Sequence, residues 1–281
     1  MGSSRCRSDV DFPPPAKTPT GPAGAPGRML CMTTTGSPDA RTSATEPVRQ
    51  RLLGLIGGMS WESTAQYYRT ANELVRDRLG GFHSARLVLT SVDFAEIEAL
   101  QVSGDWDGAG PILAAEAARL EAAGAELLLL CTNTMHKVAD RIEAAVSVPL
   151  LHLADTTAAA VRAAGLTTVG LLATAFTMEQ SFYRDRLAAH GLQVLVPEAD
   201  DRAEVHRIIY DELCQGRFLP ESRRTYQQVI DRLVAAGAQG VVLGCTEIEL
   251  LIGAEDSPVP VFATTRLHVE AGLAAALGAV D

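Results

Sequence analysis

The segment AAGAELLLLCTNT at residues 122–134 aligns without a gap with AAGAQGVVLGCTE at residues 235–247, and this internal similarity is the strongest indication of the fold. Each copy contains an apolar run that leads into a segment rich in Cys and Thr, which is typical of a buried strand of a parallel sheet followed by a loop. An internal similarity of this kind can reveal a duplication. The alternative is that AAGA before an apolar strand recurs by chance in an Ala-rich α/β protein, and the Cys- and Thr-rich end that both copies share favours duplication. We therefore expect two similar halves with related strands at equivalent positions.

Around the repeat, short apolar segments alternate with Ala-rich amphipathic segments from residue 51 onward. A helix is expected near residues 63–79. A weaker internal similarity relates residues 54–69 to residues 170–184. The segments that we predict as strands are LLGLIGG, ARLVLTSV, AELLLLCT, VPLLHLA, TVGLLAT, LQVLVPE, QGVVLGCT and VPVFATT. This rhythm predicts an α/β protein with helix-covered parallel sheets. We expect a first domain over residues 49–149 plus 262–281 and a second over residues 150–261.

Composition argues against nucleic-acid-binding, membrane-spanning and secreted proteins. The 281 residues carry a net charge of -10 and are 47% hydrophobic, so there is a large core but no basic surface for nucleic acid. No apolar run is long enough to span a membrane, and the start lacks a secretory signal. Five cysteines without a CxxC pair favour a cytoplasmic protein with reduced thiols. Residues 1–48, rich in Pro, Gly, Ser and Thr, are expected to be a disordered leader, with Met29 and Met32 as alternative starts.

The register of the repeat singles out one pair of side chains. Cys245 aligns with Thr132, whereas Cys131 aligns with Gly244. Ligands of parallel sheets bind beyond the carboxyl ends of the strands, and neighbouring strand residues point to opposite faces. If Cys245 faces a cleft, Thr132 should face it from the other half and Cys131 should be a core thiol. We also expect the Gly-Cys-Thr turn to direct N–H groups and a helix N-terminus at Cys245, lowering its pKa toward neutrality.

Five motifs carry a resemblance to a known family: GLIGGMSWEST, SVDFAEIEALQ, LCTNTMHKVAD, FTMEQSFYRDRL and LGCTEIELL. From residue 52 onward the chain resembles the aspartate/glutamate racemase superfamily, and within it the broad-specificity bacterial amino-acid racemases that carry a Cys-Thr-Asn-Thr string. The resemblance implies two flavodoxin-like three-layer domains with parallel sheets and an active site in the cleft between them. It also implies a small amino-acid substrate, no cofactor, and a homodimer as one option.

The resemblance further implies that two acid/base groups flank the substrate Cα. Alignment on Asn133 and Thr134 places Thr132 at the first of these positions, in agreement with the internal repeat, and Cys245 at the second. The family assigns the second position to the L enantiomer, and a hydroxyl is a much weaker acid than a thiol, so a preference for L substrates is expected.

Six further side chains are candidates for binding substrate. Helix capping is the alternative role for Ser60, Asn133 and Thr134, and Gln101 could be an ordinary amide on a helix surface. His206 and Tyr210, one helical turn apart, are weaker candidates that we interpret as part of a packed or solvated helix face, and His136 is interpreted as a helix residue. The candidates are Ser60, Gln101, Asn133, Thr134, Thr246 and Glu247.

Other chemistries fit less well. The two lysines, Lys17 and Lys137, lack the setting of a pyridoxal phosphate site, no metal-binding spacing is found, and GxGxxG is absent. A single-thiol decarboxylase or cis-trans isomerase of the same superfamily stays open, as does a non-catalytic amino-acid-binding protein. The substrate side chain also stays open among aspartate, glutamate and a broader set such as homoserine.

Overall fold

The computed structural model describes residues 49–278, so the expected leader at residues 1–48 lies outside the described part. Within that part, eight strands form two parallel four-stranded sheets. The first sheet has the order β2 (Leu87–Ser91), β1 (Leu53–Gly57), β3 (Leu127–Leu130) and β4 (Leu150–Leu151). The second has the order β6 (Gln193–Leu195), β5 (Thr168–Ala173), β7 (Gly240–Gly244) and β8 (Val261–Ala263). The two orders are equivalent, which confirms the two similar α/β halves.

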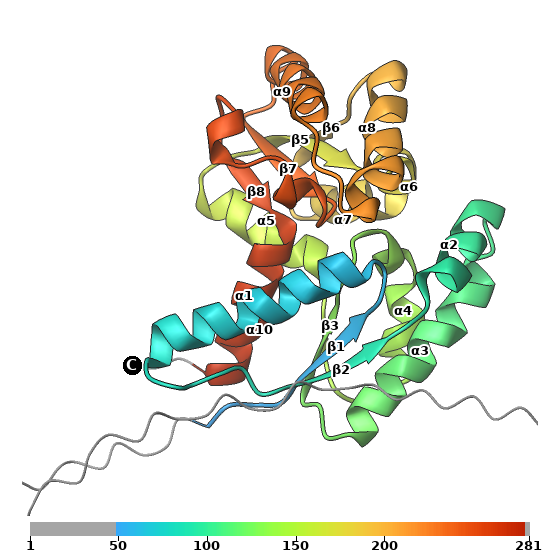
Figure 1. The fold of residues 1–281 in the computed structure, drawn as a ribbon, viewed down its shortest axis with the longest axis vertical. Coiled ribbons are helices and arrows are strands. Elements are labelled where there is room, and N and C mark those ends of the chain that lie inside the picture. Colours follow the sequence, from blue (N-terminus) through green and yellow to red (C-terminus); the bar gives the residue numbers. More distant parts are fainter. Residues whose placement is uncertain (1–48, 279–281) are drawn as a thin grey trace, which may run out of the picture. The chain divides into compact units, whose positions relative to one another are not determined.

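Helices cover both faces of the first sheet (Figure 1). One face packs against α1 (Trp61–Leu79) and α10 (Thr264–Leu277), and the other against α2 (Phe94–Ser103), α3 (Trp106–Ala122) and α4 (Ala139–Glu143). Strand β3 shows why both faces are covered, because its side chains alternate between them. Leu127 and Leu129 pack in the core beneath α1 and α10, and Leu128 and Leu130 pack in the core beneath α2, α3 and α4. A short 3-10 turn, η1 (Thr134–Val138), connects β3 to α4.

The second sheet is enclosed in the same manner. Helix α5 packs on α7, and α8 packs on α9. Its helices are α5 (Leu153–Ala163), α6 (Ala175–Glu179), α7 (Ser181–Ala189), α8 (Ala199–Asp211) and α9 (Pro220–Ala235), with 3-10 turns η2 (Leu213–Gln215), η3 (Ile248–Leu250) and η4 (Ala254–Asp256). No helix within residues 49–278 has the length and apolar character that crossing a membrane requires.

The chain passes between the sheets twice, after β4 and after β8. Strand β4 pairs with β3, so it belongs to the first sheet although it lies beyond residue 149. Strand β8 pairs with β7 and reaches Ala263, beyond residue 261. Each sheet therefore extends two residues past the expected domain boundary, because apolar strand residues run up to the crossover. Helix α10 then packs on α1 and β3. The boundaries themselves stay a prediction.

Three buried histidines lie beside these crossovers. The ring centroids of His136 and His152 are 4.5 Å apart, and those of His136 and His268 are 5.9 Å apart. Burial lowers the pKa to about 3 for His136 and His268 and to about 4 for His152. All three rings are therefore neutral in the folded protein near pH 7.

The hydrogen bonds of two rings fit the neutral form. His136 Nδ1 donates to the carbonyl of Thr132 at 2.7 Å, and its Nε2 accepts from the backbone N–H of Leu153 at 3.2 Å. His268 Nε2 donates to the carbonyl of Leu151 at 2.8 Å, and its Nδ1 lies 2.9 Å from the hydroxyl of Tyr67, which donates to it. Protonation of His136 would put a second N–H against the backbone N–H of Leu153, and protonation of His268 would require the Tyr67 hydroxyl to accept instead of donate.

We expect the free energy of unfolding to fall as the pH drops below about 6.5, the ordinary pKa of histidine, toward pH 4. In this window the unfolded chain takes up protons that the folded chain excludes, so stability is greatest above it. Urea unfolding at several pH values measures the slope. His268→Gln should lower the slope by about one proton, whereas His83→Gln, at an exposed position, should leave it unchanged. An unchanged slope in the first variant would contradict the neutral assignment.

Candidate active site

One cavity lies at the carboxyl ends of β1, β3 and β7, where the two halves of the fold meet. Its volume is about 30 Å³, the space of a water molecule rather than of an amino acid. The structure brings all eight residues predicted from the sequence to its wall. These residues are Ser60, Gln101, Thr132, Asn133, Thr134, Cys245, Thr246 and Glu247.

The ends of β3 and β7 position the two central side chains. Thr132 and Cys245 both line the cavity, each 8% exposed. Cys131 is fully buried in the core between the first sheet and helices α1 and α10, as strand alternation predicts. Gly244 lets β7 approach β5 closely, because a Cβ atom there would lie 2.8 Å from Leu171 Cδ1. The tight packing fixes where Cys245 leaves the strand.

The carboxylate of Glu247 is the centre of the hydrogen bonding. It accepts from Ser60 Oγ at 2.5 Å, from Cys245 Sγ at 3.0 Å and from Thr246 Oγ1 at 2.8 Å. Ser60 belongs to the first half and the other donors to the second. Ser60 also caps α1, with its Oγ accepting from Ser63 N at 3.4 Å, so capping and a place in the site coexist. One buried carboxylate thus joins the halves next to the thiol.

The expected lowering of the Cys245 pKa is wrong. Burial raises the pKa of the thiol well above its ordinary value, and the neighbouring Glu247 carboxylate raises it further. The turn after β7 leads into η3, a 3-10 helix of three residues and not an α-helix that could present a strong dipole. Cys245 therefore rests as a thiol whose proton points at a carboxylate.

Asn133 lines the cavity and carries an acceptor without a partner among the described residues. The hydroxyl of Thr264 donates to the carbonyl of Leu243 at 2.8 Å, so it must accept from Asn133 Nδ2, which lies 3.1 Å away. This bond fixes the orientation of the amide. Asn133 Oδ1 is buried, and no described residue donates to it. A free buried acceptor is suited to an ammonium group.

Threonine hydroxyls form a second contact between the halves. Thr134 Oγ1 lies 3.0 Å from Thr174 Oγ1 and 3.1 Å from Thr177 Oγ1. Thr174 lines the cavity and caps α6. The first half thus places a hydroxyl, and the second half a carboxylate, at equivalent positions of the repeat, Thr134 and Glu247.

Sequence reasoning missed part of the wall. Tyr210 lines the cavity and donates to Gln101 Oε1 at 3.2 Å, while Gln101 Nε2 lies 3.0 Å from Met135 Sδ. The rings of Phe94 and Tyr210 stack with centroids 6.5 Å apart. The signal for Tyr210 was present in its helical spacing from His206, which we interpreted as packing. Cys214, also in the wall, gave no signal.

The described residues that line the cavity carry a single charged side chain. Among the described residues that line the cavity, Glu247 is the only charged side chain, and neither Arg nor Lys is present. The remaining members are apolar, aromatic or neutral polar groups. They are Met59, Phe94, Thr174, Ile209, Tyr210, Cys214 and Gly244. The described residues also hold no group of three or more His, Cys, Asp or Glu side chains that could bind a metal ion.

Comparisons with known proteins identify a family and related structures. The sequence profile of the Asp/Glu/hydantoin racemase family matches residues 56–272. A Yersinia pestis structure with the provisional description of an Asp/Glu racemase is 54% identical, covers 81% of this chain and all of its own, and has a TM-score of 0.76. An aspartate racemase homologue from Pyrococcus horikoshii is 34% identical, with the same coverage and a TM-score of 0.73.

A more distant structure shares the fold. Glutamate racemase from Francisella tularensis, solved in complex with D-glutamate, is 14% identical, with 83% of this chain and 84% of that chain covered and a TM-score of 0.59. At this identity the likeness concerns the fold alone. It supports the two-domain flavodoxin-like architecture.

Replacing Glu247 by Gln should lower the pKa of the Cys245 thiol, because the neighbouring negative charge is removed while the shape is kept. The rate of alkylation of the Cys245 peptide by iodoacetamide, followed by mass spectrometry across pH, reports the change. Glu249→Gln is the matched control, since Glu249 is a half-buried neighbour whose carboxylate accepts from the backbone N–H of Thr265 at 2.7 Å. An unchanged or higher pKa in Glu247→Gln would count against this arrangement.

Proposed function

Because the chain belongs to the Asp/Glu/hydantoin racemase family, we propose that it is an amino-acid racemase that needs no cofactor and uses Cys245 and Thr132 on opposite faces of the substrate Cα. The observation that supports this most directly is their convergence in one cavity from equivalent strand ends of the two halves. Each half supplies one proton-transfer group.

The thiol and the carboxylate act as a pair in this proposal. The proton of Cys245 moves to Glu247, which already accepts it in a hydrogen bond, and the thiolate then removes the Cα proton. The electron pair left on Cα spreads into the substrate carboxylate. Thr132 delivers a proton to the opposite face while its oxygen takes up a proton from a water molecule, so that no alkoxide remains. The hydroxide formed is neutralised when Glu247 releases its proton, which restores the starting state.

Substrate contacts follow from the polar groups of the wall. Asn133 Oδ1 and the Glu247 carboxylate are suited to the substrate ammonium group. The hydroxyls of Ser60, Thr134 and Thr246 and the N–H groups of their loops are donors for the α-carboxylate, where negative charge grows during the reaction. The absence of Arg and Lys among the described lining residues leaves a second carboxylate without a cation, which favours neutral side chains within the broader substrate set.

Binding requires the two halves to part at the cavity. A volume of about 30 Å³ does not hold an amino acid. The bonds between Ser60 and Glu247 and between Gln101 and Tyr210 cross from one half to the other. We infer that substrate groups replace these bonds, so that little hydrogen bonding is lost on opening.

The two faces of Cα are not equivalent in this mechanism. A threonine hydroxyl cannot rest as an alkoxide near pH 7, so removal of the proton of a D substrate by Thr132 is much slower than removal from an L substrate by Cys245. A preference for L-amino acids follows. Since the reaction needs a reduced thiol, we also expect the protein to work in the cytoplasm.

Incubation of the purified protein in D2O with matched L- and D-amino acids should give Cα deuteration that is faster from the L enantiomer. Cys245→Ala should reduce this exchange by a factor of about 10³ or more, since it removes the base. Cys131→Ala, the matched cysteine variant in the core, should keep most of the activity. Deuterium incorporation and chirality are read by mass spectrometry and chiral chromatography.

Three results would reject the proposal. The first is equal exchange from both enantiomers, and the second is loss of activity in Cys131→Ala with Cys245→Ala unaffected. The third is binding of amino acids without any exchange at Cα, which would identify a non-catalytic binding protein. Release of CO2 from a substrate would instead identify a decarboxylase.

A further inference from the structure

Two polar side chains that the proposed mechanism does not use lie at equivalent positions of the internal repeat. His136 follows Thr132 by four residues, and Glu249 follows Cys245 by the same number. His136 belongs to η1, the turn after β3, and Glu249 to η3, the turn after β7. Each loop that carries a proton-transfer group therefore also carries a polar side chain at the same point.

Both side chains accept a hydrogen bond from the helix that follows a crossover. His136 Nε2 accepts from the backbone N–H of Leu153, the first residue of α5, at 3.2 Å. Glu249 Oε1 accepts from the backbone N–H of Thr265, in the first turn of α10, at 2.7 Å. The N–H groups of a first helical turn have no partner within the helix and need an acceptor from elsewhere. Ala263, which precedes α10, has no side chain that could cap it, so Glu249 supplies the acceptor.

In the first half, the ring of His136 joins Thr132 directly to α5. Its Nδ1 donates to the carbonyl of Thr132 at 2.7 Å while its Nε2 holds the N–H of Leu153. The ring is buried, so water does not replace a bond that is lost there. The backbone of Thr132 is therefore held at a fixed place relative to the start of α5.

In the second half, the first turn of α10 is bonded to the chain on both sides of Cys245. Glu249, after Cys245, holds the N–H of Thr265. The hydroxyl of the neighbouring Thr264 donates to the carbonyl of Leu243, which precedes Cys245 on β7, at 2.8 Å. The loop that carries the thiol is therefore fixed to the start of α10.

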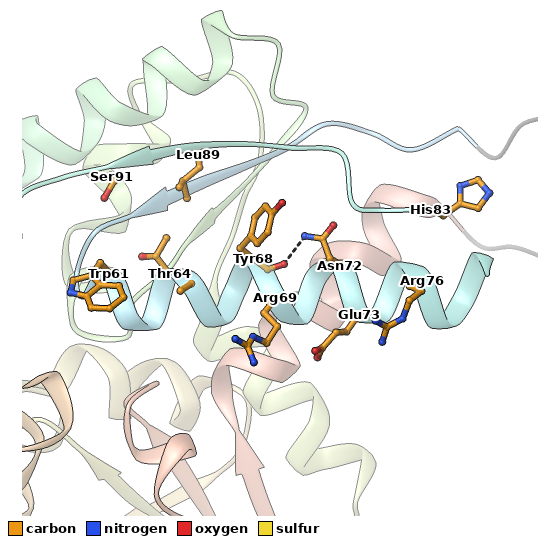
Figure 2. A pocket seen from close by; sticks show the side chains of 11 residues that line it. Trp61, Thr64, Tyr68, Arg69, Asn72, Glu73, Arg76, His83, Leu89 and Ser91 are labelled. Atoms are coloured by element: carbon orange, nitrogen blue, oxygen red, sulfur yellow. Dashed lines mark hydrogen bonds between the residues drawn. The ribbon is translucent and has the colours of Figure 1, made fainter. Parts of the chain in front are cut away.

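The two helices that receive these bonds form one unit, because α5 and α10 pack on each other (Figure 1). The outer face of α1 takes no part in this arrangement. It borders, with β2, an open groove of about 710 Å³ (Figure 2), and none of the residues that line the groove lines the active-site cavity. The crossover helices are therefore the common frame to which both proton-transfer loops are bonded.

We propose that His136 and Glu249 are a matched pair of positioning residues, each of which fixes the proton-transfer group of its half to a crossover helix. This inference rests on the proposed function, because it takes Thr132 and Cys245 as the groups on opposite faces of Cα. Neither His136 nor Glu249 lines the cavity, so each acts through the residue that it holds. The two groups then keep their separation while the rest of the wall moves apart to admit substrate. Such control matters because a displacement of about 1 Å can slow a reaction by a factor of about 10².

Initial rates in D2O test the pair, because one intermediate gives two products. The full chain is incubated with L-homoserine, L-aspartate and L-glutamate, and products are resolved by chiral chromatography and mass spectrometry. A deuterated L-amino acid forms when Cys245 returns a deuteron to the face that it deprotonated. The D-amino acid forms when Thr132 delivers a deuteron to the opposite face. A loss of fold stability lowers both products without changing the ratio of D product to deuterated L substrate.

The two variants should move this ratio in opposite directions. His136→Leu should lower it about tenfold, since Thr132 loses the bond that places it. Glu249→Leu should slow total exchange about tenfold and raise the ratio, since a displaced Cys245 both removes and returns the proton more slowly. Glu249→Gln keeps an acceptor oxygen for the N–H of Thr265 and should restore the behaviour of the unchanged protein.

His268→Leu is the matched control for the loss of a buried ring. His268 bonds Tyr67 and the carbonyl of Leu151 and has no hydrogen bond to either proton-transfer loop, so the ratio should not change.

A second substitution covers the case in which His136→Leu does not fold. His136→Gln keeps an acceptor for the N–H of Leu153 but has no donor at the Nδ1 position, and it should still lower the ratio. If the unchanged protein exchanges and the ratio stays the same in the variants of both positions, this inference is overturned and the proposed function stands. If the unchanged protein shows no exchange with any of the three substrates, both are overturned.

Discussion

The buried carboxylate of Glu247 is the interaction on which the rest of the site depends. A charged group removed from water needs several hydrogen-bond partners, and Glu247 finds three in Ser60, Cys245 and Thr246. Because Ser60 comes from the first half, satisfying this carboxylate draws the loop after β1 onto the end of β7. The same contact holds the proton on the Cys245 thiol. The Glu247 carboxylate therefore both holds the two halves together and keeps the Cys245 thiol protonated.

The duplicated topology makes the differences between the two strand ends chemically meaningful. Equivalent sheet orders place Thr132 and Cys245 at matching positions, so the two differ by hydroxyl against thiol on the same frame. The asymmetry extends further, because the repeat aligns Thr134 with Glu247. Among the described residues that line the cavity, only the second half has a carboxylate beside the side chain that we propose for proton transfer, whereas Thr134 of the first half contacts other hydroxyls. Two similar halves thus form a site whose two sides differ in acid/base strength.

The strands and the register of the site could be predicted from the sequence because both depend on local pattern. Buried parallel strands are nearly continuous apolar runs, and side-chain alternation separates Cys131 from Thr132. Tyr210 and Cys214 could not be placed in this way, since the packing of α8 and η2 brings them to the cavity. The pKa of Cys245 was mispredicted for a related reason, because it depends on burial and on where the Glu247 carboxylate points.

The hydrogen bonds between the halves indicate where the cavity can open while the rest of the fold stays fixed. At the crossovers, His136, His152 and His268 form a buried neutral cluster that bonds the backbone on both sides of the first crossover. Separating these groups would leave buried donors and acceptors unpaired. At the cavity, by contrast, the bonds between the halves join side-chain hydroxyl, amide and carboxylate groups, which the ammonium and carboxylate groups of the proposed amino-acid substrate can bond in their place. We therefore expect opening to occur at the cavity, with the crossovers as the fixed side.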